Sequence, residues 1–232
     1  MRGAGFRKKG FTLVEMSVVL VIAGLLIFGI SVGYVLKKNA TLKSIVDDMG
    51  AVNTAVHEFE KTYGGLPGDL WNATEKFGAT NTNNGNGNGS IDGTEHVLFW
   101  QHLQLAGLIK GSYDGATNKP GIGVMKAPYP QSGYYVTSVN NVFRIGIAIY
   151  SDTDNSGTID RVDTEDRIAV LSPSDAKYLD ERYDDGDPTK TSGIIYGFEG
   201  SSASGTCVSG GKYNTPNDGI ACRLEMVLGR EN

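Results

Sequence analysis

The chain has 232 residues, with 21 Lys and Arg against 26 Asp and Glu, and a formal net charge of −5 at pH 7. This length is enough for one membrane span and one globular domain. The acidic balance argues against nucleic-acid binding through bulk charge, so we expect no nucleic-acid partner. The 32 glycines, many of them in Asn-, Ser- and Thr-rich stretches, are typical of an extracytoplasmic domain rich in loops.

The basic N-terminus and the apolar run behind it form the most specific pattern. Residues 7–9 (Arg-Lys-Lys) precede residues 10–15 (Gly-Phe-Thr-Leu-Val-Glu), and an uncharged apolar run follows from Met16 to Leu36. About 20 such residues let a helix cross the hydrocarbon core of a membrane. Positive residues before the run keep the N-terminus cytoplasmic. The rest of the chain is then expected on the far side of the membrane.

The small residue Gly10 stands before the apolar run, whereas an ordinary secretory signal is cut after it. Cutting after Gly10 would remove residues 1–10 and keep the helix. This arrangement resembles the leader of type IV pilins and type II secretion pseudopilins. The resemblance implies that a prepilin peptidase cuts after Gly10 and methylates Phe11, the new first residue. The leader holds four basic and no acidic residues, so the mature charge would be 17 − 26 = −9.

Glu15 corresponds to the acidic residue near the start of that family's motif. A carboxylate at the edge of an apolar helix needs a partner, and cleavage would supply the new ammonium of Phe11. The pairing is either within one chain or between neighbouring subunits, where it would set the axial register of a filament. The simpler alternative is a single-span anchor. Gly29 and Gly33 have a spacing that permits close helix approach, although glycine is frequent in membrane spans anyway.

The helix is expected to continue beyond the apolar run, because apolar residues recur in steps of three and four up to Tyr63. Gly64-Gly65 would end it. We expect a leader at 1–10, a transmembrane or filament-core helix at 11–36, its amphipathic continuation at 37–63, and an extracytoplasmic head at 64–232. The residues of the amphipathic face are Leu42, Ile45, Val46, Met49, Val52, Val56, Phe59 and Tyr63.

The head shows signals of short helices and strands. Residues 66–69 (Leu-Pro-Gly-Asp) fit a type II turn, resemble a stretch in a group of pilin-like proteins, and place Asp69 as the cap of a short helix to Phe77. The expected fold class is α+β: a long N-terminal helix, half membrane-spanning and half amphipathic, packed on a head with an antiparallel sheet and short helices. Further helices are expected over 95–109 and 173–183, the latter capped by Ser172, and strands over 133–139, 142–150, 167–171, 193–199 and 220–228.

Cys207 and Cys222 are the two cysteines of the chain. In the oxidising compartment beyond the membrane we expect them to form a disulfide, with two buried free thiols as the alternative. A loop of this size would stabilise the head by about 3 kcal/mol in the chain-entropy model. A Cys-closed loop near the C-terminus also resembles many type IV pilins.

Two segments space their oxygen ligands like a calcium loop. The alternative for both is a solvated turn, since Asn, Asp, Ser and Gly are also turn residues. The stronger candidate supplies Asp152, Asp154, Ser156, the Thr158 carbonyl, Asp160 and Asp163. The weaker candidate, in which Asn replaces Asp three times, supplies Asn84, Asn86, Asn88, Ser90, Asp92 and Glu95.

No catalytic constellation is visible. His57, His96 and His102 show neither metal-ligand spacing nor a Ser-His-Asp arrangement. The sequence also lacks a phosphate-binding loop and a dinucleotide fingerprint. We therefore expect a protein that is not an enzyme.

The resemblance implies a structural subunit of a type IV filament. Its partners would be copies of itself in a helical homopolymer, the prepilin peptidase and an inner-membrane assembly platform. The precursor would lie in the bacterial inner membrane and the filament in the periplasm or outside the cell. One alternative is a type II secretion pseudopilin, favoured by the absence of a proline that pilins often carry in this helix. Another is a minor or tip pilin that acts as a calcium-dependent adhesin or binding module.

Overall fold

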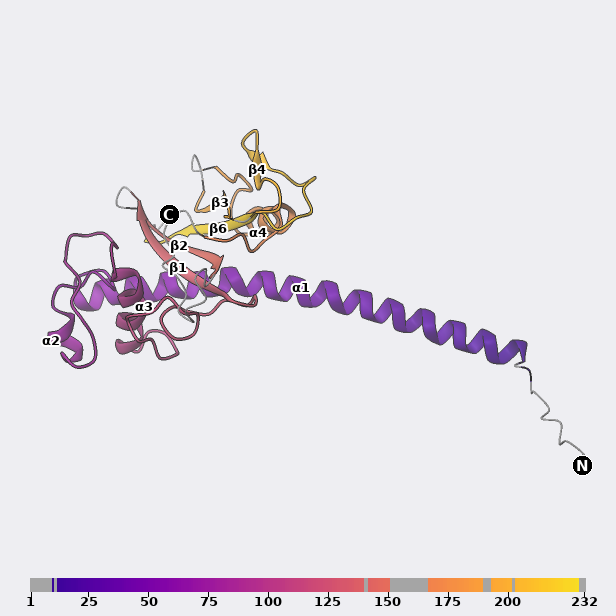
Figure 1. The fold of residues 1–232 in the computed structure, drawn as a ribbon, viewed down its shortest axis with the longest axis horizontal. Coiled ribbons are helices and arrows are strands. Elements are labelled where there is room, and N and C mark those ends of the chain that lie inside the picture. The colour runs from indigo at the N-terminus through magenta and orange to yellow at the C-terminus, as the bar shows by residue number, and fades with distance from the viewer. Residues whose placement is uncertain are drawn as a thin grey trace, which may run out of the picture. The chain divides into compact units, whose positions relative to one another are not determined.

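The structure is a computed structural model that describes residues 10, 12–139, 142–150, 167–189, 193–201 and 203–229. The chain divides into two compact units, residues 1–41 and 42–232. Helix α1 (Leu13–Tyr63) has 51 residues and runs from the first unit into the second (Figure 1). In the described part of the chain it is the one helix long and apolar enough, by length and composition, to cross a membrane.

The first half of α1, up to Leu36, carries apolar side chains on all sides. Nearly all the large ones are exposed, including Leu20, Leu25, Phe28 and Ile30. A helix that is apolar all round is one suited to lipid or to a protein core. The expected apolar first half is therefore confirmed.

The second half of α1 is amphipathic, as its spacing predicts, and its apolar face is buried in the head. Gly64 follows the helix with φ 73° and donates its N–H to the carbonyl of Glu60 at 2.8 Å, so the helix ends where Gly64-Gly65 indicates. The buried residues are Leu42, Ile45, Met49, Val52, Ala55, Val56 and Phe59.

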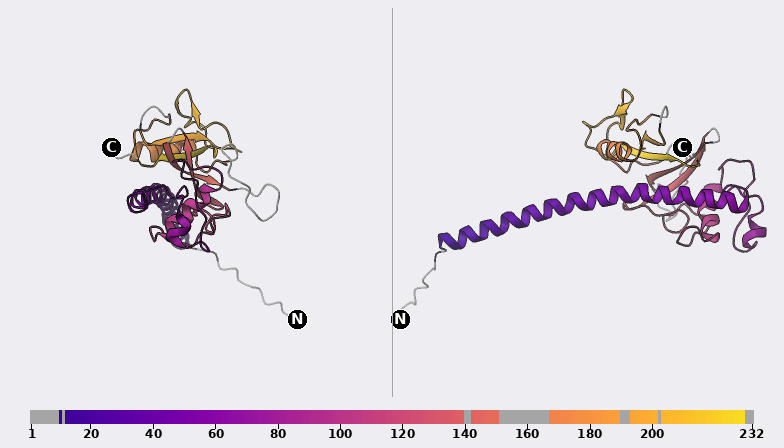
Figure 2. Two further views of the ribbon diagram at one scale, coloured as in Figure 1. Left: turned by 90° about the vertical axis from the view of Figure 1, so that its left-hand side faces the viewer. Right: turned by 180° about the vertical axis from the view of Figure 1, so that it is seen from behind.

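The head contains a four-stranded antiparallel sheet with the order β1-β2-β6-β3. The strands are β1 (Ser132–Val139), β2 (Val142–Ile149), β3 (Ile195–Glu199) and β6 (Cys222–Val227). Pairing of Val139 with Val142 confirms the expected hairpin, whose two turn residues lie outside the described part. Figure 2, in its left view, shows the sheet as a layer on one side of the second half of α1.

The two faces of the sheet differ in chemistry. The row Val136, Ile145, Met226 and Ile195 belongs to the hydrophobic core shared with the second half of α1. The next row holds Tyr135, Gly146, Glu225 and Tyr196 and faces the other way, because neighbouring strand residues alternate. Polar groups are therefore concentrated on the sheet face away from the core.

Three short helices complete the head: α2 (Ala73–Phe77), α3 (Glu95–Leu105) and α4 (Pro173–Tyr183). Helix α4 begins as expected, with Pro173 in its first turn and the Ser172 hydroxyl accepting the Asp175 N–H at 3.2 Å. Helix α3 ends four residues before the expected end, because the chain adopts a left-handed conformation at Gly107 (φ 75°).

Two expectations for the head are wrong. Residues 167–171 form isolated bridges, such as Leu171 with Cys222, and no strand. Asp69 does not cap α2, which begins after Asn72, because the Asp69 carboxylate binds a loop elsewhere. A small hairpin was also missed: β4 (Val208–Ser209) and β5 (Lys212–Tyr213) are joined by Gly210 and Gly211, both with positive φ.

Candidate functional site

Thr12 and Glu15 cap the N-terminus of α1 reciprocally. The Thr12 N–H and hydroxyl donate to Glu15 Oε2 at 2.8 and 2.9 Å, and the Glu15 N–H donates to Thr12 Oγ1 at 3.2 Å. This is a capping box, a motif that the Thr-x-x-Glu spacing could have predicted. Glu15 Oε1 makes no hydrogen bond within the described residues. Gly10 is exposed, and Phe11 lies outside the described part.

The weaker candidate calcium loop, residues 84–95, is described. Asn86 Nδ2 and Asn88 Nδ2 donate to the two oxygens of Asp92 at 3.1 and 2.8 Å. The Oδ1 atoms of the same two residues accept backbone N–H groups two positions ahead, at Asn88 and Ser90. Three predicted ligands are thus brought together, with amide nitrogens facing the carboxylate.

Asn84 and Glu95 of this set bind backbone amides instead of Asp92. Asn84 Oδ1 accepts the N–H of Thr74 at 2.8 Å. The two oxygens of Glu95 accept the backbone N–H groups of Asn86 and Asp92, at 2.8 and 2.9 Å. Burial raises the pKa of Glu95, while these two hydrogen bonds act against that rise.

Asp69 is the central anchor of this loop, and the sequence analysis did not identify that role. Its carboxylate is buried and accepts the N–H groups of Gly87 (2.6 Å), Asn88 (3.1 Å) and Gly89 (2.8 Å). The preceding Gly68 has φ 89°, which fits the predicted type II turn. The Leu-Pro-Gly-Asp turn therefore holds the loop by backbone amides.

His102, on α3, ties the same turn to the core. Its Nδ1 accepts the Gly68 N–H at 2.9 Å, so its Nε2 carries the proton and donates to the carbonyl of Asn83 at 3.1 Å. Burial lowers the pKa of His102 to about 4, and the ring is therefore neutral at pH 7. His102 acts as a structural clamp with both nitrogens occupied.

The stronger candidate calcium loop, from Asp152 through Asp154, Ser156, Thr158 and Asp160 to Asp163, lies outside the described residues.

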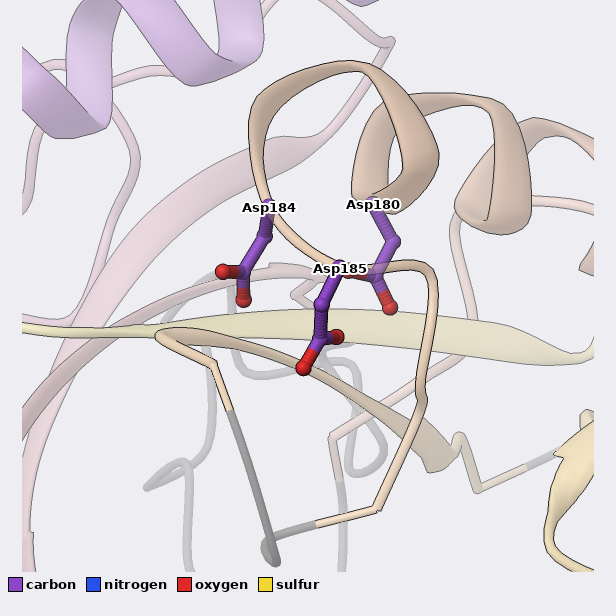
Figure 3. A group of neighbouring side chains, drawn as sticks. All are labelled: Asp180, Asp184 and Asp185. Atoms are coloured by element: carbon purple, nitrogen blue, oxygen red, sulfur yellow. The ribbon is translucent and has the colours of Figure 1, made fainter.

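A group of three carboxylates lies at the end of α4 (Figure 3). Oxygen atoms of Asp180, Asp184 and Asp185 lie within 4.8 Å of one another. Asp180 accepts the Tyr213 hydroxyl at 2.8 Å, and burial raises its pKa to about 6. Asp184 Oδ2 accepts the N–H groups leading into β3, at Ile194 (2.5 Å) and Ile195 (2.6 Å). The carboxylates thereby connect the helix end to the neighbouring segments.

The two cysteines form a disulfide, Cys207–Cys222, as predicted. It joins the residue before β4 to the first residue of β6, and both cysteines are fully buried. The Glu199 carboxylate accepts the Cys207 N–H at 2.8 Å and the Val208 N–H at 3.0 Å. The cross-link and these bonds hold the C-terminal loop against the edge of the sheet.

On the other sheet face, one buried carboxylate meets three guanidinium groups. Glu225 accepts hydrogen bonds from Tyr135 at 2.8 Å, from Arg167 at 3.2 Å and from Arg223, and Arg144 Nη1 lies 3.7 Å away. The Nε atoms of Arg144 and Arg167 are buried without a hydrogen-bond partner. The cluster joins three strands to the segment before α4, and no local sequence signal marks it.

Residues 5–31 match the family model of the prokaryotic N-terminal methylation motif. The match includes Gly10, Phe11, the Thr12–Glu15 capping box and much of the apolar half of α1. No curated protein and no solved structure matches the chain. The motif is that of the type IV pilin and pseudopilin family, whose members are not enzymes, and the apolar helix is consistent with a membrane-anchored precursor. The chain is therefore a pilin-like protein that carries a prepilin cleavage and methylation motif.

Proposed function

We propose that the chain is a structural subunit of a type IV filament that assembles through the first half of α1. The observation that carries this proposal is a matched processing motif whose Gly10 stands directly before a helix half with exposed apolar side chains on every side. Apolar surface of this extent favours burial in lipid or against other subunits. In the precursor this apolar surface would be buried in lipid, and in the filament it would be buried against the same helix of neighbouring copies.

The capping box supports a specific part for Glu15. Its Oε2 is engaged by Thr12, while Oε1 has no hydrogen bond within the described residues. The ammonium that cleavage creates at Phe11 of an adjacent subunit could bind Oε1 without breaking the cap. A charge pair of this kind in an apolar filament core would set the axial register, since an unpaired carboxylate there is costly.

The test joins mass spectrometry of the mature N-terminus with imaging of filaments from a Glu15→Ala strain. We expect a methylated Phe11 as the first residue in both strains, and a loss of filaments in the variant. Glu75→Ala, which removes an exposed carboxylate in α2, is the matched control and should leave filaments intact. A mature N-terminus at any residue other than Phe11 would contradict the proposal.

The same imaging separates pilus from pseudopilus and major from minor subunit. Purified surface filaments made mostly of this chain would indicate a pilin. Trace amounts at filament ends would indicate a minor or tip subunit with a binding role. Filaments confined to the periplasm would indicate a secretion pseudopilin.

Calcium binding is a second proposed property of the head. Its support is the ligand spacing of residues 152–163 and, for residues 84–95, the meeting of Asn86, Asn88 and Asp92. In the 84–95 loop a cation would have to displace two amide donors from Asp92, so affinity there should be in the millimolar range. Calorimetry of the full chain tests both loops. Asp152→Ala should remove the heat of the 152–163 loop, and Asp92→Ala should remove the smaller heat of the 84–95 loop. The absence of any calcium heat in the parent would contradict the proposal.

A further inference from the structure

A cavity of about 390 Å³ lies beside the C-terminal end of α1. This volume is within the range of small-molecule sites. The lining residues come from the last turn of α1, the two glycines after it, the Leu-Pro-Gly-Asp turn with the two residues that follow it, and the 84–95 loop. The lining includes Glu60, Gly64, Gly65, Trp71, Gly87 and Gly89.

Trp71 is an exposed aromatic on this wall. Its side chain is 65% exposed, whereas Trp100, the other tryptophan, is fully buried. Gly87 lies against it, because a Cβ added there would be 3.1 Å from Trp71 Cβ. Gly87 is held in turn by its 2.6 Å hydrogen bond to the buried Asp69. The base of the tryptophan therefore rests on an anchored loop.

Glu60, at the last turn of α1, supplies a lining carboxylate with free hydrogen-bonding capacity. Within the described residues its carboxylate accepts no hydrogen bond, and its one ionic contact is with His57 Nδ1 at 3.9 Å. The side chain is 39% exposed. Partial burial raises the pKa of Glu60, as expected for a carboxylate that lacks hydrogen-bond donors.

Two of the lining glycines leave space in the cavity. Gly64 and Gly89 have positive φ, and an added Cβ at either would meet nothing within 4 Å. A ligand can therefore approach the backbone closely there. The lining thus offers one exposed indole, one carboxylate acceptor and glycines that leave the backbone accessible.

We propose that this cavity binds a pyranose sugar. The C–H face of the sugar ring would stack on the indole of Trp71, where burial of a large aromatic surface gives most of the affinity. Ring hydroxyls would donate hydrogen bonds to the Glu60 carboxylate, which when ionised acts only as an acceptor. Trp71 is the single aromatic among the described lining residues. One aromatic side chain is enough to stack on one face of a sugar ring, whereas an ammonium ligand prefers a cage of several aromatic side chains.

Acrylamide quenching of the full chain in lipid nanodiscs tests the proposal, because Trp71 is accessible to the quencher and Trp100 is not. Methyl β-D-glucopyranoside, methyl β-D-galactopyranoside and methyl α-D-mannopyranoside serve as probes. At least one should protect Trp71 saturably, and tetramethylammonium chloride should not. Absence of protection by all three glycosides, or stronger protection by tetramethylammonium, overturns the proposal.

Variants measured by saturation-transfer NMR locate the site. Trp71→Ala should weaken the affinity for the protecting glycoside by about tenfold or more, and Trp71→Phe should retain most of it. Glu60→Gln should weaken it less than Trp71→Ala. Tyr178→Ala, a change to an exposed aromatic on α4, is the matched control and should bind like the parent. Unchanged binding by Trp71→Ala, with an unchanged circular-dichroism spectrum, overturns the proposal.

Sugar binding at this cavity does not depend on filament assembly. A Trp71→Ala strain should still produce filaments, and Glu15→Ala protein should still bind the glycoside. The two proposals can therefore fail separately.

Discussion

The two halves of α1 are one continuous helix with opposite relations to their surroundings. From Leu13 to Leu36 the side chains are apolar on all sides and exposed. From Leu42 to Phe59 the apolar residues form one face, which the head covers, while charged residues occupy the other. The second half thus buries its apolar surface against the head of its own chain. The first half must find lipid or other subunits, because burial of apolar area is the main favourable contribution in both cases.

This difference follows from periodicity alone. Apolar steps of three and four confine the burial of the second half to one side. The uniform first half has no preferred side, so it can be surrounded by lipid and later by several neighbouring helices. The second half therefore serves the folding of the head, and the first half is left for the anchoring and assembly that we propose.

The largest difference in stability between the two halves is expected from replacing one phenylalanine in each. Phe59 is fully buried and its ring lies 4.6 Å from that of Tyr63, whereas Phe28 is 68% exposed. Phe59→Ala should lower the free energy of unfolding of the head by about 3–5 kcal/mol, since it leaves a cavity in the core. Phe28→Ala should leave it unchanged. Urea unfolding of the full chain in nanodiscs measures both, and equal effects would contradict the division.

The second test is pH dependence. The folded-state pKa of His102 is lowered to about 4 from an ordinary 6.5, so its contribution is complete above pH 6.5 and is lost as the pH falls through 4. The loss should be about 3 kcal/mol. Unfolding free energies at pH 7 and 4 should show it, and His102→Gln should remove that part of the slope. In the first half of α1 residues 16–33 contain no titratable side chain, so helix content there should not change.

Asp180 opposes His102 over part of this range and needs its own control. Its folded-state pKa is raised to about 6 from 3.8, so its contribution is present below pH 3.8 and lost as the pH rises through 6. The His102 measurement is therefore best made in an Asp180→Asn background. If His102→Gln keeps the parental slope there, the clamp does not account for the pH dependence.

A smaller effect is expected at the hydrogen bond between the second half of α1 and the sheet. The buried Tyr134 donates its hydroxyl to Asp48 at 2.8 Å. Tyr134→Phe should cost about 1–2 kcal/mol, because it leaves a half-buried carboxylate without its donor. Lys43→Ala breaks the exposed ion pair with Asp47 on the same half and should cause no measurable change. Equal losses in urea unfolding would mean that burial does not decide the value of these contacts.

The parts of the fold that local signals specify were predictable. The spacing of apolar residues located both halves of α1, and Ser172-Pro173 located the start of α4. The β1–β2 hairpin followed from two β-rich runs split by two residues. The same kind of signal, Gly210-Gly211, marks the β4–β5 hairpin that was missed. Each of these elements depends on residues a few positions apart.

The parts that depend on distant partners were not predictable. Asp69 binds amides 18 to 20 residues away, which drew it from the cap role that its position suggests. The calcium-loop spacing indicated that Asn86 and Asp92 lie close together, and they form a hydrogen bond. It did not indicate that Asn84 accepts the N–H of Thr74, which lies outside residues 84–95. No pattern within a window of the sequence carries such contacts.

The smallest effect on stability should come from replacing a glycine in each half. The two replacements should nevertheless differ in their effect on filament yield. An added Cβ meets nothing within 4 Å at Gly33 in the first half or at Gly50 in the second. Either change to alanine should therefore stabilise the helix slightly, by up to about 1 kcal/mol. If the first half packs against other subunits through its small residues, Gly33→Ala should still reduce filament yield, because the added methyl keeps neighbouring helices apart. Gly50→Ala should leave the yield unchanged. Counting filaments by electron microscopy at equal precursor levels measures this, and equal yields from both variants would exclude Gly33 from the contact between subunits.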